Sequence, residues 1–403
     1  MPSPKGGRLT ETMSARRPGT VQVSPPTSSP EMRVLQVSSF APPHLGGLEA
    51  CAANLFGKLI ESGTLVTWLF SDIPPQMPIE NTIRIKAWNG IETVFGIPVP
   101  IPRPTSIVKI WKAVRDAHLV HIHDIMYFNS VLAAVFAKLL GKRLVTTLHI
   151  WKVPYRSYLV RLIQEISHAV LGQLCLRNSK AIVSYNRLTF QKLKKFKNAR
   201  IEFIPNGISD VFLQSKYEIS PNVQSQLRLS LGLPQDKQIA IFAGRFVEKK
   251  GLSSIRILAN SFPEVLFVLC GEGNIDPFRW DLENTRVLGQ KSRVELKRLF
   301  HASDILLLPS VGEGFPLVIQ EAMACGLPCF ILRETWQSWG EGKDFFVVTE
   351  NEHFVADLRS YFDCPFSWVH KERIREYARL NWDWDKSVQE YRKIYREILA
   401  PEP

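Results

Sequence analysis

Two glutamates eight positions apart, Glu313 and Glu321, form the clearest chemical pattern in the sequence. They lie in residues 309–328, which follow a short apolar run at 303–308 and begin with a glycine-bearing turn that leads into a stretch predicted to be helical. This order places a helix N-terminus at the carboxyl end of a buried strand. The N–H groups and the dipole of such an N-terminus favour an anion, for example a phosphate. A carboxylate on each side could hold hydroxyl groups at the two ends of a sugar–diphosphate–nucleoside.

Each glutamate taken singly also fits a plainer role, Glu313 as a solvated loop acid and Glu321 as an exposed helix residue. The complete order of strand, turn and helix, which ends at Gly326 and Pro328, makes that alternative weaker.

Two cations follow another predicted strand. Arg245 and Lys250 come after the apolar residues 239–244 and stand before Gly251. Because both leave the same strand end, they can reach one diphosphate, Arg245 through its planar fork of donors and Lys250 as a point charge. A lone arginine and lysine would be weak evidence. We expect the neighbouring Lys249 to be exposed.

Both segments resemble a known family. The Glu-x7-Glu and Gly-Arg-x4-Lys-Gly patterns stand about sixty residues apart and are similar to two signatures of the retaining, GT-B-fold glycosyltransferases of glycosyltransferase family 4. The resemblance implies that Glu313 lies beside the donor sugar and that Glu321 binds the ribose. It also implies that Arg245 and Lys250 neutralise the leaving diphosphate.

The start of the helix is a further donor-binding segment that the resemblance implies. The backbone amides of Gly314 and Phe315 would hold the diphosphate, with Pro316 and Leu317 beside them.

Two other loops of this half are expected to contact the donor. Gly271 follows the predicted strand 265–270 in a Gly-x-Gly turn. Gln290 and Lys291 follow the next strand, and in relatives this loop meets the nucleotide base largely through backbone groups. Beyond residue 328 the sequence departs from the family pattern, because Trp336 and Trp339 replace small residues. The resemblance therefore does not predict the residues on that side of the donor pocket.

The N-terminal half begins with a strand at residues 32–37 and a loop that contains a Gly-Gly pair. The pair alone is a weak signal because the GxGxxG pattern is absent. By its position it resembles the family's first loop, so Gly47 is expected to face the donor phosphates and the acceptor.

Histidines lie at two strand ends of this half. Strand alternation puts His121 and His123 on one face, and Asp124 follows them. The family has a matching His-x-His-Asp segment at its cleft, so His123 and Asp124 are expected to contact donor or acceptor. His149, at the end of the strand 142–150, is expected near the acceptor and the reaction centre. The plainer alternatives are histidines with structural hydrogen bonds and, for His149, a side chain that points into a loop.

Composition limits the protein class. The chain has 403 residues, of which 45% are apolar, and this suffices for two globular domains. The net charge of +12 suggests an anionic partner, which could be a nucleotide, a phospholipid surface or a nucleic acid. The first thirty residues lack the apolar core of a signal peptide, and no apolar run reaches membrane-spanning length. We therefore expect a cytoplasmic protein.

The six cysteines are scattered, and the sequence contains no Cys/His cluster with zinc-ligand spacing. They are expected to be buried free thiols in a reducing compartment. We expect no metal and no other cofactor, with the nucleotide sugar as substrate.

Alternating strands and helices predict an α/β protein, and the resemblance specifies the GT-B architecture, with two doubly wound Rossmann-like domains facing a cleft. We expect a disordered tail over 1–31, an N-terminal acceptor domain over 32–206 and a C-terminal nucleotide-sugar domain over 207–380. The helix in 381–403 would pack back on the first domain. Residues 74–104 have no predicted structure.

Two basic segments could touch an anionic membrane. Residues 105–117 form a predicted amphipathic helix, and residues 191–197 interleave Lys with Leu and Phe. The plainer alternatives are an ordinary surface helix and a solvated helix end. Residues 158–177 are predicted to form one long helix.

The predicted function is transfer of a sugar from a nucleoside diphosphate to an acceptor hydroxyl with retention, in glycan, polysaccharide or glycolipid biosynthesis. The acceptor would be a glycan or lipid-linked, peripheral contact with the inner face of an anionic membrane is plausible, and no nucleic acid partner is expected. Three alternatives stay open. They are a GT-B epimerase of nucleotide sugars, a glycogen-phosphorylase-like enzyme, for which the chain is short, and a non-catalytic protein that binds anionic lipid or nucleic acid.

Overall fold

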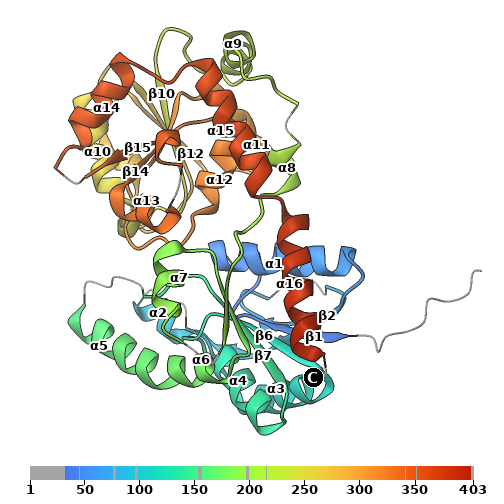
Figure 1. Ribbon diagram of the computed structural model, residues 1–403. Coiled ribbons are helices and arrows are strands. Elements are labelled where there is room, and N and C mark those ends of the chain that lie inside the picture. The colour runs from blue at the N-terminus through green and yellow to red at the C-terminus, as the bar shows by residue number, and fades with distance from the viewer. Residues whose placement is uncertain are drawn as a thin grey trace, which may run out of the picture. The chain divides into compact units, whose positions relative to one another are not determined.

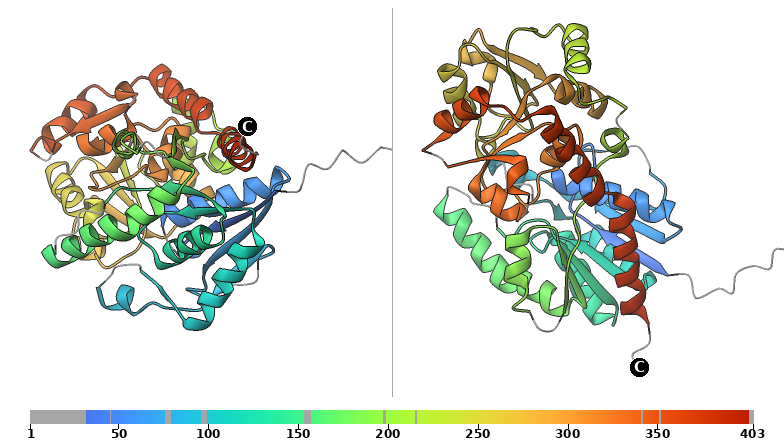
Figure 2. Two further views of the ribbon diagram at one scale, coloured as in Figure 1. Left: turned by 60° about the horizontal axis from the view of Figure 1, so that its bottom comes forward. Right: turned by 45° about the horizontal axis from the view of Figure 1, so that its top comes forward.

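The computed structural model describes residues 32–44, 46–75, 79–95, 99–152, 157–196, 199–214, 216–340, 342–350 and 352–400. Two open parallel β-sheets, with helices packed on their faces, make up most of this part of the chain (Figures 1 and 2). A small antiparallel pair, β4 (Ala87–Trp88) and β5 (Ile101–Pro102), forms a separate ribbon. The predicted tail over residues 1–31 lies outside the described residues.

The first sheet has seven parallel strands in the order β3-β2-β1-β6-β7-β8-β9. Their bounds are β1 (Arg33–Val37), β2 (Leu65–Ser71), β3 (Thr82–Ile85), β6 (Leu119–His123), β7 (Arg143–Leu148), β8 (Ala181–Ser184) and β9 (Arg200–Phe203). Every residue of β6 and β8 is buried, as expected for strands covered on both faces. The chain reverses its direction of progress across the sheet between β1 and β6, so their carboxyl ends form a topological switch point.

The second sheet repeats this winding with six parallel strands in the order β12-β11-β10-β13-β14-β15. Their bounds are β10 (Ile239–Ala243), β11 (Leu266–Cys270), β12 (Thr285–Gly289), β13 (Ile305–Leu308), β14 (Cys329–Leu332) and β15 (Phe346–Thr349). Here the switch point lies between β10 and β13.

Helices connect these strands and cover their faces. Their bounds are α1 (Gly47–Glu61), α2 (Gly90–Phe95), α3 (Pro104–Asp116), α4 (Phe128–Leu139), α5 (Tyr158–Ser167), α6 (Gln173–Asn178), α7 (Arg187–Leu193), α8 (Asp210–Leu213), α9 (Pro221–Ser230), α10 (Leu252–Ser261), α11 (Arg293–Ala302), α12 (Leu317–Ala324), α13 (Arg333–Trp339), α14 (Phe354–Asp363), α15 (Trp368–Asn381) and α16 (Trp384–Leu399). Side-chain caps set several helix starts, because an oxygen of the capping residue accepts a backbone N–H of the first turn. The capping residues include Ser157, Asn186, Ser220, Ser292 and Ser367.

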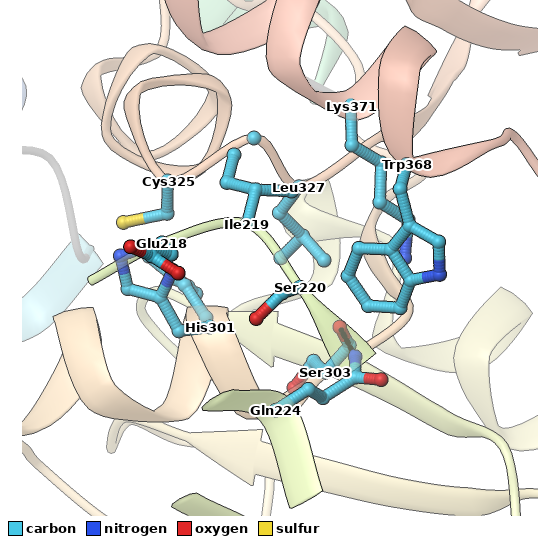
Figure 3. A pocket seen from close by; sticks show the side chains of 12 residues that line it. Glu218, Ile219, Ser220, Gln224, His301, Ser303, Cys325, Leu327, Trp368 and Lys371 are labelled. Carbon is cyan, nitrogen blue, oxygen red and sulfur yellow. Dashed lines mark hydrogen bonds between the residues drawn. The ribbon is translucent and has the colours of Figure 1, made fainter. Parts of the chain in front are cut away.

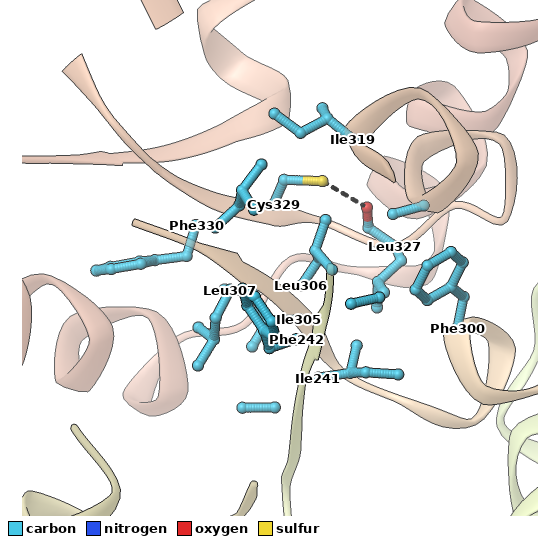
Figure 4. Packing of buried hydrophobic residues seen from close by; sticks show 14 of the residues in the cluster. Ile241, Phe242, Phe300, Ile305, Leu306, Leu307, Ile319, Leu327, Cys329 and Phe330 are labelled. Carbon is cyan, nitrogen blue, oxygen red and sulfur yellow. Dashed lines mark hydrogen bonds between the residues drawn. The ribbon is translucent and has the colours of Figure 1, made fainter. Parts of the chain in front are cut away.

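The core of the second sheet fixes the helix that carries the glutamate pattern. Ile241 and Phe242 of β10 and Leu306 of β13 are fully buried at its centre (Figure 4). Ile319 of α12 and Phe330 of β14 pack into the same cluster. Because α12 buries this apolar side, its N-terminus is held in place at the carboxyl edge of the sheet.

The last helix, α16, packs on the first sheet, which confirms the predicted return of the chain. Its Tyr391 hydroxyl lies 3.0 Å from the Thr147 hydroxyl, and the Tyr395 hydroxyl lies 2.8 Å from Nδ1 of His121. The Ser387 hydroxyl donates to the Pro205 carbonyl at 2.8 Å. The preceding helix, α15, packs against α12 of the second sheet. Together α15 and α16 connect the two sheets.

Several element predictions need correction. Residues 74–104, which had no predicted structure, contain β3, β4, α2 and β5. The predicted long helix 158–177 is helical along its length, but His168–Gly172 winds as a π-helix between α5 and α6. The domain boundaries at 206 and 380 stay predictions.

Helix α3 behaves as an ordinary amphipathic surface helix, with Ile110 and Val114 buried and Lys109 and Lys112 exposed. This supports the plainer alternative for that basic segment. Five of the six cysteines are buried free thiols, as predicted, whereas Cys364 is exposed. No helix in the described ranges is long and apolar enough to cross a membrane.

Candidate functional site

The predicted site residues gather where the strand order of each sheet reverses. In the second sheet, β10 leads to Arg245 and Lys250, and β13 leads to Glu313. In the first sheet, β1 leads to the loop before Gly47, and β6 leads to Asp124. Loops on the two sides of a switch point diverge and leave a crevice where doubly wound proteins bind ligands. Both sheets therefore present predicted ligand contacts at their crevices.

Glu313 and Lys250 form an ion pair that joins the loops after β13 and β10. The Lys250 Nζ lies 2.8 Å from Oε1 of Glu313, and both side chains are mostly buried. Burial alone would raise the pKa of Glu313, but the charges of Lys250 and Lys249 lower it below the ordinary glutamate value. Glu313 is therefore ionised at neutral pH and available as an acceptor for a hydroxyl group.

The prediction that Lys249 is exposed is wrong. Its side chain is half-buried, and its carbonyl accepts the N–H of Val311, which holds it against the loop after β13. Burial lowers the pKa of Lys249, Glu313 opposes this shift, and the charges of Lys250 and Arg245 add to it. Two lysines thus act on one carboxylate with Arg245 close enough to act on Lys249, and this excess of positive charge suits a diphosphate.

Close backbone contacts at two glycines hold these loops together. At Gly271, which has a φ of +144°, a Cβ would lie 1.9 Å from the Gly244 carbonyl oxygen. A Cβ at Gly251 would lie 2.1 Å from the Pro309 carbonyl oxygen. Any side chain at either position would push neighbouring loops apart, so the predicted residue Gly271 has a structural role at the strand ends.

Gly314 brings the second sheet's central loop against the first sheet. Its carbonyl accepts a hydrogen bond from Nδ2 of Asn186 at 2.7 Å. A Cβ at Gly314 would lie 2.2 Å from the carbonyl oxygen of His149. The structure therefore brings together Gly314 and His149, two residues predicted independently from the two halves of the sequence.

Aromatic packing supports the loop from behind. The buried ring of Phe315 stacks on Trp339 with centroids 4.1 Å apart, and Trp339 packs edge-on against Trp382. Trp336 is half-buried, with the Lys343 ammonium 5.8 Å from its ring centre. Trp339 thus fills the space behind the loop that contains Phe315.

Helix α12 begins directly after the loop. Pro316 stands immediately before its first residue, Leu317, and Glu321 lies in its second turn. Burial raises the pKa of Glu321 to about 7, and the charge of Arg293 opposes the shift. Glu321 and Arg293 also act electrostatically on the Cys51 thiol of α1. The carboxylate predicted to bind ribose therefore lies close enough to the first helix of the N-terminal half to act on its thiol.

Two histidines lie side by side at the ends of β6 and β7. Nδ1 of His123 is 3.0 Å from Nε2 of His149, and both rings are buried. Burial lowers the pKa of His123 to about 3 and that of His149 well below the ordinary range, so both are neutral at pH 7. Asp124, with a φ of +61°, accepts the backbone N–H of His149 at 2.8 Å, and burial raises its pKa to about 7. His121 instead bonds to α16, so its role is structural.

The glycine loop of the first sheet contains a cluster that sequence reasoning missed. Gly47 is the exposed first residue of α1, and a Cβ there would meet no atom within 4 Å. Beside it, the ring of His44 bonds to Glu49 at 3.0 Å and to Glu92 at 3.1 Å. Burial would lower the pKa of His44, but the two carboxylates raise it. The sequence could have suggested the contact between His44 and Glu49, because both stand near the Gly-Gly pair. It could not have suggested Glu92, which lies in a segment with no predicted structure.

Gln290 and Lys291 lie farther along the edge of the second sheet. They follow β12, the edge strand, which β11 separates from β10. Gln290 is exposed, and the Lys291 ammonium lies 3.5 Å from Oε1 of Glu295. The structure places both at carboxyl strand ends but away from the Glu313–Lys250 pair.

A pocket of about 20 Å³ lies away from all of these residues. Glu218, His301 and Lys371 are among the side chains that line it (Figure 3). Its volume suits roughly one water molecule, and no predicted site residue lines it. Within the described residues, no group of three or more His, Cys, Asp or Glu is arranged to hold a metal ion.

Two family models match the chain. Residues 45–211 match Glycosyltransferase Family 4, and residues 223–380 match Glycosyl transferases group 1. All of the predicted site residues lie within these two matches.

Two curated proteins illustrate the sequence similarity. The putative teichuronic acid biosynthesis glycosyltransferase TuaC of Bacillus subtilis (strain 168) is 28% identical over 347 residues, which cover 82% of this chain and 85% of TuaC. The UDP-Gal:alpha-D-GlcNAc-diphosphoundecaprenol alpha-1,3-galactosyltransferase of Escherichia coli is 25% identical over 197 residues, 46% of this chain and 47% of that enzyme.

Solved structures share the fold at low identity. Sucrose-phosphate synthase of Thermosynechococcus elongatus gives a TM-score of 0.69 at 19% identity, covering 91% of this chain and 99% of that one. HepE of Anabaena in complex with UDP gives a TM-score of 0.69 at 18% identity, and the match covers 91% of this chain and 100% of HepE. These similarities confirm the predicted GT-B architecture.

Proposed function

Because the chain belongs to the group 1 glycosyltransferases of glycosyltransferase family 4, we propose that it transfers a sugar from a nucleoside diphosphate to an acceptor hydroxyl with retention of the anomeric configuration. The observation that carries the proposal is the Glu313–Lys250 ion pair, which stands at the switch point of the second sheet beside two further cations. A diphosphate sugar supplies both the anion and the hydroxyl groups that this cluster would bind.

Donor binding would divide the ion pair between two parts of the ligand. Lys250 and Arg245 would turn to the diphosphate, and the N-terminus of α12 would add backbone amides at Gly314 and Phe315. Glu313 would accept a hydroxyl of the donor sugar, and Glu321 would accept those of the ribose. Negative charge grows on the diphosphate as the bond to the sugar breaks, so these donors stabilise the transition state electrostatically.

The histidine pair would serve as a contact for the acceptor. His123 and His149 are neutral, and their lowered pKa values make them weak bases near pH 7. We therefore assign no protein base to the acceptor proton, and the departing diphosphate would take it. Gly314 beside His149 marks where the two substrates would meet.

The acceptor belongs, in this proposal, to polysaccharide or glycolipid biosynthesis. The support is the names of two relatives, which refer to teichuronic acid biosynthesis and to a diphosphoundecaprenol-linked sugar.

Thermal unfolding with UDP, GDP, ADP, CDP and dTDP tests the proposal. One nucleotide at a hundred times its dissociation constant should stabilise the wild type by about 2.7 kcal/mol. The same nucleotide should have little effect on Lys250→Ala, whereas Lys237→Ala, an exposed lysine of the same half, should respond like the wild type. If no nucleotide stabilises the wild type, the proposal fails and a non-catalytic binding protein becomes the better explanation.

Product analysis then tests the reaction. With a donor of the identified nucleotide, an acceptor should be required for sugar release, and NMR of the product should show the donor's anomeric configuration. Interconversion of nucleotide sugars without an acceptor would identify an epimerase instead.

A further inference from the structure

Helix α5 exposes its apolar side chains to solvent. None of its ten residues is buried, and Leu159, Ile163 and Ile166 are each more than half exposed. With Leu162 and Val170 they recur at intervals of three and four residues, which places them on one side of the helix. We call these five residues the α5 stripe.

The opposite side of the helix faces the protein and is mixed, because the half-buried Val160 and Leu171 lie there beside polar residues. Gln164 and Ser167 are half-buried and His168 is buried, with the ring of His168 4.4 Å from that of Trp151. A surface helix normally turns its apolar side toward the core and its polar side toward water. Five apolar side chains of this helical segment instead face solvent, and packing within the described part of the chain does not account for them.

The charge of the chain is concentrated in the same region. Residues 141–200 contain thirteen Lys or Arg and one acidic residue, Glu165, so their net charge of +12 equals that of the whole chain. Acidic and basic residues balance over the remainder. The single acid of this segment is paired with Lys152.

Exposed cations lie near the C-terminal end of α5. The Lys192 ammonium lies 5.8 Å from the ring centre of Trp151, which itself packs on His168 after α5. Lys194 and Lys195 follow on the same segment and are exposed. An apolar stripe on a segment with a large excess of positive charge is the composition of helices that lie in the interface of anionic membranes.

We propose that the α5 stripe docks the protein on an anionic lipid surface. The stripe would enter the boundary between headgroups and acyl chains, and the lysines of residues 192–195 would contact phosphate headgroups. A second copy of this chain is a poorer occupant, because it would bring another +12 segment against the first. This surface differs from α3, whose apolar side is largely buried.

Docking would place the reaction centre close to the membrane. The chain passes from His149 at the end of β7 to the start of α5 at Tyr158, a span of at most about 30 Å. On the proposed function, a lipid-linked acceptor hydroxyl would therefore approach His149 from the docked side.

Vesicle co-sedimentation of the full chain tests the docking. The probes are phosphatidylcholine vesicles with and without about one third phosphatidylglycerol. We expect binding to the anionic vesicles, and at least about a tenfold loss for the triple variant Leu159→Gln/Ile163→Gln/Ile166→Gln. The matched control replaces Leu229, Ile257 and Val369 by Gln. They are equally exposed apolar residues of the second half, and that variant should bind as the wild type does.

Three outcomes would overturn the proposal. The stripe variant could bind anionic vesicles as strongly as the wild type does. The wild type could fail to bind either kind of vesicle, or light scattering could show a wild-type dimer that the stripe variant does not form.

Salt at about 1 M shortens the Debye length to about 3 Å and should weaken binding to the anionic vesicles. The nucleotide stabilisation of the stripe variant should stay at the wild-type value. That measurement separates a failure of docking from a failure of the proposed function.

Discussion

At the residue scale, the Lys250 ammonium already has a partner, because it lies 2.8 Å from Oε1 of Glu313. An incoming diphosphate must therefore compete with a buried carboxylate for the same ammonium. Lys249 and Arg245 supply the excess charge that makes this exchange favourable. The pair can thus act as a preformed template, with each partner close to the group that it would contact in the complex.

Replacing Glu313 by Gln should separate donor affinity from catalysis. Glutamine no longer competes for Lys250, so the nucleoside diphosphate should bind at least as tightly as in the wild type. Transfer should slow by about a hundredfold or more, because an interaction with the reacting sugar is lost. Calorimetric binding and steady-state rates measure the two effects. Glu334→Gln, an exposed acid of α13, is the control, and equal losses of binding and rate would contradict this role for Glu313.

Asp124 should make stability fall as the pH rises from about 4 to about 7. In that window the folded protein keeps a proton, because burial raises the pKa to about 7, whereas the unfolded chain has released it. Asp124→Asn retains an oxygen for the His149 N–H and cannot ionise. Urea unfolding at pH 5 and pH 8 should show a decline smaller by about 2 kcal/mol in the variant. The stability of the variant should still fall somewhat over this pH range, because burial also raises the pKa of Glu321 to about 7.

At the scale of elements, the two switch points place each loop where its residues can meet. The carboxyl ends of β10 and β13 bring together residues more than sixty positions apart, and Gly314 carries this group against the end of β7. The contact is made by backbone atoms, so its geometry depends on the absence of a side chain.

Gly314→Ala should therefore damage the protein, whereas Gly47→Ala should not. The added Cβ of the first variant would lie 2.2 Å from the His149 carbonyl oxygen, and the resulting strain should cost about 1–3 kcal/mol of unfolding free energy. Gly47 opens α1 with free space around it, so alanine should leave stability unchanged or raise it by up to about 1 kcal/mol. Equal stability of the two variants in urea would exclude a tight contact at Gly314.

The sequence predicted most elements because apolar runs separated by Gly and Pro have few alternatives in an α/β protein. Residues 74–104 escaped prediction because β3 is short and mostly half-buried, and prolines surround it. The glutamate and arginine–lysine patterns predicted the residues of the site. They could not predict the Glu313–Lys250 pair or the half-buried Lys249, which depend on how two loops meet. Periodicity likewise reveals that α5 has two sides without telling which side faces the protein.

The whole molecule is held together through its C-terminal helices. Helix α15 packs on α12, which carries Glu321, and α16 lies on the first sheet, where its tyrosines bond to His121 and Thr147. His121 is two residues before His123 on β6. The histidine-bearing strand β6 is therefore held in part by a segment about 270 residues away.

Tyr395→Phe should show how much the hydrogen bond between Tyr395 and His121 contributes to the free energy of unfolding. It leaves Nδ1 of His121 buried without its hydroxyl partner, at a cost of about 1–3 kcal/mol. Tyr217→Phe, whose half-buried ring packs beside His301, should change stability by less than about 0.5 kcal/mol. Chemical denaturation of both variants measures the difference, and indistinguishable midpoints would show that the His121 contact contributes little.

The uneven distribution of charge has a kinetic consequence. Because residues 141–200 hold the whole net charge, the protein carries an electric dipole that an anionic surface will rotate during approach. The torque acts within a few Debye lengths, each about 8 Å at physiological ionic strength. Residues 141–200 should therefore face the surface on approach. A larger share of encounters should then lead to binding than if the orientation were random. Added salt should consequently slow capture more than it speeds release.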